Sequence, residues 1–517
     1  MTKLKVWEKA FAALLFFAAT AIALSAQVTF TSLGSFDNAN GYDPSGPLVQ
    51  GTNGKLYGTV IYGTSGDTIC DNGCGGIFTL APGGGITVDY SFCNANPNCT
   101  LGNFPAYGML LSANGELYGT TASGGTEQVG TIYTYSPSTG VTTIYNFCAK
   151  QGGANCVNGY EPVGGLMQGT DGNFYGTTQY GGAASTPEGT LFKITPPGDL
   201  TTLYSFCAAN ACPGGAHPTA PPVQAPNGNF YGTANFGGAN SSSDCVSAGC
   251  GAIYQATPTG KVTTLYNFCG KTNCTDGSTP VAGLVQGNDG NLYGTTLWGG
   301  AGGTQNICYG ACGTVFKITP AGTLTTLYNF CSQPSCADGS SPYSTLTLGS
   351  DGNFYGTTYN GGTGTNCTTL NGCGTIFKIT PAGKLTTLHS FDMTDGFNPT
   401  ALFQATDGDF YGTTAAGGEY STCADFGCGA TFKLSVGLSP FVRAIPSAGG
   451  SGSNVIILGS KLTGATAVSF NGTAATFTVV SGTEITATVP AGATSGFVMV
   501  TTPGGVLKSN VKFRVTE

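Results

Sequence analysis

The 20 cysteines are the residues whose type and spacing most clearly indicate chemistry. They fall into ten close pairs. In the repeated segments of the chain, both members of a pair are present or absent together, as expected of disulfides. Zinc is the competing assignment, but each pair would need two further ligands, and the only histidines are His217 and His389. We therefore predict disulfides, with no metal site and no cofactor. The ten close pairs are Cys70/Cys74, Cys93/Cys99, Cys148/Cys156, Cys207/Cys212, Cys245/Cys250, Cys269/Cys274, Cys308/Cys312, Cys331/Cys336, Cys367/Cys373 and Cys423/Cys428.

Carboxyl and imidazole groups are the next candidates for catalysis. Many of the acids occupy a repeated turn position at which other copies carry asparagine, which marks a turn residue. His217 lies in a loop before Pro218 with no Ser or Cys nucleophile near it in sequence, and His389 replaces a strand tyrosine. No spacing selects the pair of carboxylates that a glycosidase needs, so no catalytic residue is predicted. The acids that could face a substrate are Asp67, Asp71, Glu127, Glu161, Glu188, Asp244 and Glu419.

Four aromatic residues are candidates for binding. Tyr62, Tyr180, Phe236 and Trp298 each stand five residues after a repeated tyrosine, among Asn, Thr and Gly. Rings in such surroundings suit stacking on carbohydrate. The alternative is that the rings pack beneath their own loops.

A repeated phrase must position these side chains. Leu/Phe-Tyr-Gly-Thr occurs seven times, at spacings of 61, 57, 56, 62, 62 and 56 residues. Four strands are expected per copy, and in the third copy they are 166–168, 173–178, 190–195 and 200–206. Asp171-Gly172 predicts a two-residue hairpin between the first two of these strands.

The two ends of the repeat array complement each other. The last copy ends near Leu434 without its fourth strand, and residues 28–37 resemble the fourth strand of the sixth copy, 385–392. If the N-terminal strand pairs into the last copy, the array closes into a ring without an orphan strand. The sequence therefore predicts a seven-bladed β-propeller over residues 27–435.

Loop lengths distinguish two faces of this ring. The hairpin Asn or Asp lies four residues before the tyrosine in all seven copies, so one face has constant spacing. The second-to-third-strand loops and the loops between blades vary in length, and they contain all ten cysteine pairs. Binding specificity is expected on the variable face, because variable loops on a fixed scaffold commonly carry it. Loop lengths that drift on a face without a function would give the same pattern.

Residues 436–517 follow a different pattern. Short alternating strands between Gly and Pro turns predict an immunoglobulin-like β-sandwich. The series Gly-x2-Gly, Val455-x-Ile457-x-Gly459 and Val468-x-Phe470-x-Gly472 resembles the IPT/TIG family, which implies a spacer or interaction module. The repeated phrases resemble the GloVer repeats of bacterial secreted proteins, a resemblance that implies no particular activity.

Residues 1–26 have the form of a secretory signal peptide, with three lysines before an apolar run and a small-residue site; a membrane anchor is the alternative. Without them the chain has 14 basic and 24 acidic residues, which disfavours nucleic acid as a partner. No later stretch is expected to span a membrane. We expect a secreted, monomeric, all-β protein that binds an extracellular glycan or protein without catalysis. The alternative is an extracellular carbohydrate-active enzyme, either a glycoside hydrolase or a lyase. A third interpretation is a structural repeat protein with no small ligand.

Overall fold

The structure is a computed structural model of the 517-residue chain. Three sets of predicted features lie outside the described residues: the signal peptide 1–26, Cys308, and the acids Asp67, Asp71 and Asp244. The regular secondary structure of the described residues is β-strand apart from two short 3-10 helices, η1 (Thr272–Cys274) and η2 (Pro334–Cys336). The structure describes residues 27–64, 70, 72–94, 98–149, 156–183, 188–207, 212–241, 245, 249–301, 312–364, 367, 372–420, 423 and 426–516.

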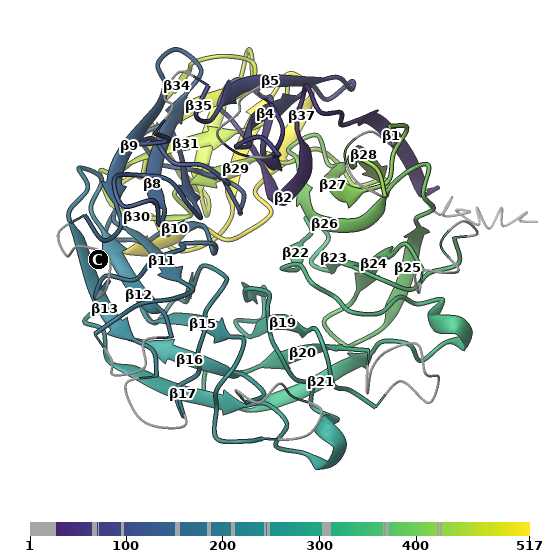
Figure 1. Ribbon diagram of the computed structural model, residues 1–517. Coiled ribbons are helices and arrows are strands. Elements are labelled where there is room, and N and C mark those ends of the chain that lie inside the picture. Colours follow the sequence, from purple (N-terminus) through teal and green to yellow (C-terminus); the bar gives the residue numbers. More distant parts are fainter. Residues whose placement is uncertain are drawn as a thin grey trace, which may run out of the picture.

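Antiparallel four-stranded sheets make up the repeat domain and surround a common centre (Figure 1). In chain order they are β2–β5 (Tyr42–Gln50, Leu56–Tyr62, Gly76–Leu80, Ile86–Ser91), β6–β9 (Leu110–Leu111, Leu117–Thr121, Thr131–Ser136, Gly140–Asn146), β10–β13 (Leu166–Gln168, Phe174–Thr178, Thr190–Ile194, Leu200–Ser205), β14–β17 (Val223–Gln224, Phe230–Ala234, Ala252–Ala256, Val262–Asn267), β18–β21 (Val285–Gln286, Leu292–Thr296, Thr314–Ile318, Leu324–Asn329) and β22–β25 (Thr347–Leu348, Phe354–Thr358, Thr375–Ile379, Leu385–Ser390). A closing sheet combines β26 (Phe397–Gln404), β27 (Phe410–Ala416) and β28 (Ala430–Ser435) with β1 (Thr29–Ser35). The four strands predicted for the third copy agree with β10–β13 within one residue at each end.

The repeated phrase has a structural reason at each position. The Tyr175 hydroxyl donates a 2.8 Å hydrogen bond to Asp171 in the preceding hairpin. A Cβ on Gly176 would lie 2.6 Å from the Phe192 ring, so only glycine fits there. Where the hairpin residue is asparagine, its side-chain amide donates to the tyrosine instead, as in Asn53 to Tyr57 at 2.8 Å. Asp and Asn are therefore interchangeable turn residues, as the sequence predicts.

Tyrosines of the phrase also join neighbouring sheets. The buried ring of Tyr175 lies 4.1 Å from that of Phe230 in β15, centroid to centroid, with a tilt of 32°. Such offset aromatic contacts stabilise by more than the area they bury. The same contact recurs between Tyr118 and Phe174, Tyr293 and Phe354, and Tyr355 and Phe410. One residue of the phrase thus fixes both its own hairpin and the next sheet.

The N-terminal strand completes the closing sheet. β1 pairs antiparallel with β28, with Phe30 opposite Leu434, which confirms the predicted pairing. The Phe30 ring stacks on His389 at 3.7 Å and packs against Phe432 at 5.4 Å. His389 belongs to the outer strand β25, and its Nε2 atom also lies 2.9 Å from a carboxylate oxygen of Asp395.

The C-terminal residues form a separate sandwich. Its strands are β29 (Arg443–Ile445), β30 (Ala448–Gly450), β31 (Asn454–Leu458), β32 (Ala467–Phe470), β33 (Thr473–Ala474), β34 (Phe477–Val479), β35 (Glu484–Thr488), β36 (Val498–Thr502), β37 (Gly505–Lys508) and β38 (Arg514–Thr516). The sheet β29-β31-β35-β34 faces the sheet β33-β32-β36-β37 across a core that includes Val455, Ile457 and Val468. No helix in the described part of the chain is long and apolar enough to cross a membrane.

Candidate functional site

The C-terminal domain docks on the hairpin face, the one with constant spacing. The Thr483 hydroxyl donates to the carbonyl of Thr52 at 2.7 Å, and the Phe441 amide donates to the carbonyl of Thr406 at 3.0 Å. Both acceptors belong to first-to-second-strand hairpins. In Figure 1 this domain (yellow) lies on the far side of the sheets. The variable loops are therefore on the face that the docked domain leaves open.

Nine disulfides are present in the described residues, and each joins cysteines close in sequence. They are Cys70–Cys74, Cys93–Cys99, Cys148–Cys156, Cys207–Cys212, Cys245–Cys250, Cys269–Cys274, Cys331–Cys336, Cys367–Cys373 and Cys423–Cys428. Four of them close the loop between the second and third strands of a sheet, and five follow the fourth strand.

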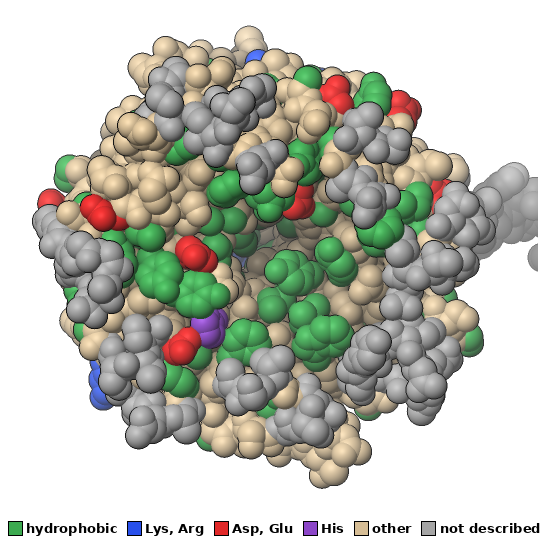
Figure 2. Space-filling view, viewed as in Figure 1, with side chains coloured by type: hydrophobic (Ala, Val, Ile, Leu, Met, Phe, Trp, Pro, Cys, Tyr) green, Lys and Arg blue, Asp and Glu red, His purple; other side chains and the backbone are tan. Residues whose placement is uncertain are grey.

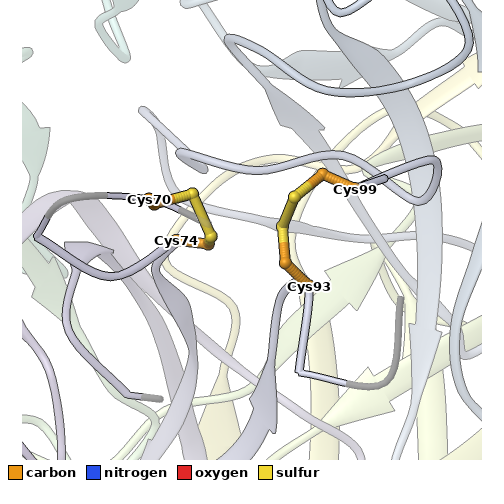
Figure 3. Close-up of side chains that lie close together, drawn as sticks. All are labelled: Cys70, Cys74, Cys93 and Cys99. Atoms are coloured by element: carbon orange, nitrogen blue, oxygen red, sulfur yellow. A yellow bond between two sulfur atoms is a disulfide. The ribbon is translucent and has the colours of Figure 1, made fainter. Parts of the chain in front are cut away.

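Some of these disulfides lie side by side. The sulfur atoms of Cys70, Cys74, Cys93 and Cys99 all lie within 4.8 Å of one another (Figure 3). The sequence-based objection that a zinc ion would lack ligands is therefore wrong at this place. If reduced, the two neighbouring pairs would together supply four thiolates. The pairing itself still favours disulfides. Cys148–Cys156 occurs without a neighbouring loop pair, and Cys367–Cys373 without a fourth-strand pair, so the pair and not the foursome is the repeated unit.

Seven residues at the start of the sheets share an unusual backbone. Each stands directly before a proline and has a positive φ, between 51° and 55°. Residues other than glycine rarely adopt this conformation, and for a β-branched residue such as Thr279 it is a clear outlier. Strained positions of this kind gather at functional sites. We call these positions the rim: Asp43, Phe104, Glu161, His217, Thr279, Ser341 and Asn398.

The disulfide loops hold the rim in place. The amide of Phe104 donates to the carbonyl of Cys74 at 3.0 Å, and that of Asn398 to the carbonyl of Cys373 at 3.1 Å. Both acceptors belong to the cystine loop of the preceding sheet. Glu161 makes the same bond to Val129, in a loop without cysteines. A short cystine gains little chain entropy, so where a cystine loop supplies the acceptor, its role is to fix the carbonyl that the rim amide needs.

One part of the rim combines a histidine, carboxylates and rings. Nε2 of His217 lies 2.5 Å from a carboxylate oxygen of Glu188. Tyr180 and Phe236 meet the His217 ring edge-on at 4.9 and 5.5 Å, and Tyr160 stacks on Tyr180 at 5.4 Å. Nδ1 of His217 has no hydrogen-bond partner among the described residues. This cluster brings together two of the predicted aromatic residues and the histidine that sequence reasoning set aside.

The pKa values of two groups beside this cluster are raised above their usual values. Burial raises the pKa of the Glu161 carboxyl above its usual value. Burial also raises the pKa of Tyr160, and the charges of Glu161, Tyr180 and Glu188 raise it further. Glu161 and Glu188 therefore both act electrostatically on Tyr160, whose ring stacks on Tyr180 of the histidine cluster.

A second part of the rim centres on Asp43. Burial raises the pKa of its carboxyl to about 6. The charge of Asp43 adds to burial in raising the pKa values of Tyr343 and Tyr359. These two tyrosines are 55% and 39% exposed, and their rings lie 6.0 Å apart. The charge of Asp43 thus acts on two solvent-accessible rings from a different sheet.

The other two predicted binding residues lie elsewhere. Tyr62 stacks on Tyr42 at 5.3 Å and meets Phe104 edge-on at 5.6 Å. Trp298 is half-buried and exchanges backbone hydrogen bonds with Ser278. Figure 2 shows the loop face. Hydrophobic side chains surround the central hollow there, with acidic side chains and one histidine among them.

Similar solved structures share little sequence with this chain. A fungal alcohol oxidase of the AA5 family, in complex with copper, is 14% identical with a TM-score of 0.49, and the match covers 95% of this chain and 100% of that one. PorZ of Porphyromonas gingivalis, described as a surface component of the type-IX secretion system, is 12% identical with a TM-score of 0.43, over 94% of this chain and 60% of that one. An aldose sugar dehydrogenase from Streptomyces coelicolor is 13% identical with a TM-score of 0.38, over 79% and 98%. No curated protein matches this chain.

Family models give the clearer result. The Gloeobacter/Verrucomicrobia repeat matches residues 20–216, 60–271 and 209–426, and the IPT/TIG domain matches residues 440–515. The repeat matches together run over more than half of the chain, in agreement with the resemblance of its phrases. The protein therefore belongs to the Gloeobacter/Verrucomicrobia repeat family and carries an IPT/TIG domain at its C-terminal end.

Proposed function

We propose that this protein is a secreted, non-catalytic binding protein that holds an extracellular carbohydrate at the rim of a closed seven-bladed propeller. The proposed domains are a signal peptide over 1–26, the propeller over 27–435 and the IPT/TIG domain over 436–517. The pairing of β1 with β28 supports the closed ring. A monomer is expected, because the described strands complete their sheets within one chain.

One observation carries the proposal more than any other. The docked IPT/TIG domain occupies the hairpin face, while the aromatic cluster of Tyr180, His217 and Phe236 lies on the loop face. Sugar rings present apolar C–H faces and hydroxyl groups. Aromatic faces beside carboxylates and an imidazole offer the matching apolar and polar partners. The backbone bonds between the rim and the loops hold these groups in place before a ligand arrives, which lowers the entropy cost of binding.

A glycan array probed with the mature protein tests this proposal. Retention of a defined set of glycans, with no released reducing sugar, is the expected result. Retention of none would contradict a carbohydrate ligand and leave an extracellular protein as the partner.

A second candidate is a carbohydrate-active enzyme. The observation that favours it is the Asp43 carboxyl, whose pKa is raised to about 6 by burial. A carboxyl that stays partly protonated near neutral pH can act as a general acid towards a glycosidic oxygen. Release of reducing sugar from a retained glycan, lost in Asp43→Asn, would favour this candidate over binding alone.

A further inference from the structure

A cavity of about 670 Å³ lies between the inner strands and the IPT/TIG domain. This size is within the roughly 300–1,000 Å³ of small-molecule sites. Its wall is built from the first-strand residue that pairs with each repeated tyrosine, and six of these seven residues are apolar. They are Val49, Leu110, Met167, Val223, Val285, Thr347 and Phe403.

The cavity has a cationic side. The whole chain contains two arginines, Arg443 and Arg514, and both line this cavity together with Lys512. None of the described residues that line it is Asp or Glu. This is unexpected for a chain with 17 basic and 25 acidic residues. Residues 440–515, however, contain five basic residues and one acidic residue.

Protein groups accept hydrogen bonds from only some of the N–H donors of these two arginines. Arg443 donates to the carbonyl of Gln404 at 2.7 Å, and its guanidinium lies over the Phe403 ring at 4.4 Å. Arg514 donates to the carbonyl of Ala225 at 2.8 Å. A guanidinium has five N–H donors, so these contacts leave donors for a ligand. Burial lowers the pKa of Arg443 to about 10, as expected of a buried cation without a countercharge.

Ion pairing between the domains does not account for these cations. The four ion pairs within the described residues all join residues of the repeat domain. A neighbouring groove of about 520 Å³ between the domains shares Asn510 with the cavity. The side-chain oxygen of Asn510 is buried without a partner among the described residues. Because the two ends of an asparagine amide are readily interchanged in a structure, this group can present its N–H donors to an anion.

We propose that this cavity binds an organic acid with an apolar body, its carboxylate on the cationic side that carries Arg443, Arg514 and Lys512 and its body along the wall of apolar first-strand residues. This site is separate from the rim and does not depend on the proposed carbohydrate ligand.

Isothermal titration calorimetry of the mature full-length protein tests the proposal, with octanoate as the probe and octanamide as the uncharged control. Octanoate is expected to bind one site per chain. Octanamide is expected to bind at least about tenfold more weakly, because it offers the arginines no charge. No saturable binding of octanoate, or equal binding of octanamide, would overturn the proposal.

Variants locate the site. Arg443→Gln and Arg514→Gln are each expected to weaken octanoate binding by about tenfold or more. Because these side chains also contact the repeat domain, Lys512→Gln provides a variant at an exposed residue, and it too should weaken binding. Lys461→Gln, on the same domain but outside the cavity lining, is the matched control and should bind as the wild type does. Unchanged affinity in Lys512→Gln and in every correctly folded arginine variant would show that the cations only hold the domains together.

Discussion

The amide of Thr406 donates a 3.1 Å hydrogen bond to the side-chain oxygen of Gln50, although 356 residues separate the two. The same glutamine bond joins sheets that are adjacent in the chain, from Ala113 to Gln168 and from Thr170 to Gln224. The first and last repeats therefore contact each other as consecutive repeats do. This relationship, with the β1–β28 pairing, supports the proposed closed ring of sheets.

Loss of this bond should weaken the ring at its closure. Gln50 is buried, so Gln50→Ala leaves the Thr406 amide unpaired and should lower the free energy of unfolding by about 1–3 kcal/mol. Urea denaturation measures the change. Gln286→Ala is a matched control, because the corresponding neighbour is Pro226, which has no N–H to lose. Equal effects of the two substitutions would show that the bond across the closure contributes nothing.

Asp43 should make stability depend on pH. Its pKa in the folded state, about 6, lies above the unfolded value of 3.8, so the folded state holds the proton more tightly. The contribution of the Asp43 carboxyl to the free energy of unfolding is largest below pH 3.8 and is lost as pH rises through about 6. Asp43→Asn should therefore raise the free energy of unfolding at pH 7. It should also remove part of the fall in that free energy between pH 4 and 6.

Asparagine suits this position, because Asn398 has the same backbone conformation at the rim. Thermal unfolding across pH 4–8 checks the prediction, with the exposed Asp199→Asn as control. A pH profile of Asp43→Asn parallel to that of the wild type would contradict it.

The cystine loops should control the rim amides individually. In a Cys70→Ser/Cys74→Ser variant, the Phe104 amide loses its fixed acceptor and should exchange hydrogen faster. The Glu161 amide, which donates to Val129 in a loop without cysteines, should exchange at the wild-type rate. Site-resolved hydrogen exchange measures both. Equal acceleration at both amides would indicate general loosening.

Glycine in the repeated phrase should tolerate no side chain. Gly176→Ala places a methyl group 2.6 Å from the Phe192 ring in a packed sheet, which should cost about 1–3 kcal/mol. Urea denaturation measures this cost. Wild-type stability would mean that the ring can shift freely.

Local patterns made much of the fold predictable. The Asp171 hairpin, the strand limits of the third copy and the return of the N-terminal strand all follow from short motifs whose partners recur at a fixed period. The constant spacing of the hairpin face was also visible, but its association with domain docking was not. Docking depends on surfaces that no periodicity in the sequence describes.

The candidate site was predictable only in part. Tyr180 and Phe236 were identified from their shared distance to the repeated tyrosine, but this distance could not show which rings would meet His217. Asp43 was missed because the exposed tyrosines that its charge affects, Tyr343 and Tyr359, belong to a distant repeat. A signal was available: one residue precedes a proline at the start of every repeat, and six of these seven residues are polar.

The central claim is that the aromatic cluster at the rim binds carbohydrate. Glycan-array retention of the wild type, compared with Tyr180→Ala and Phe236→Ala, tests it most directly, with Tyr420→Ala as an exposed aromatic control outside the cluster. The account predicts that both cluster variants lose retention by about tenfold or more, while Tyr420→Ala keeps it. Retention unchanged in both folded cluster variants, or absent in the wild type, would contradict the account.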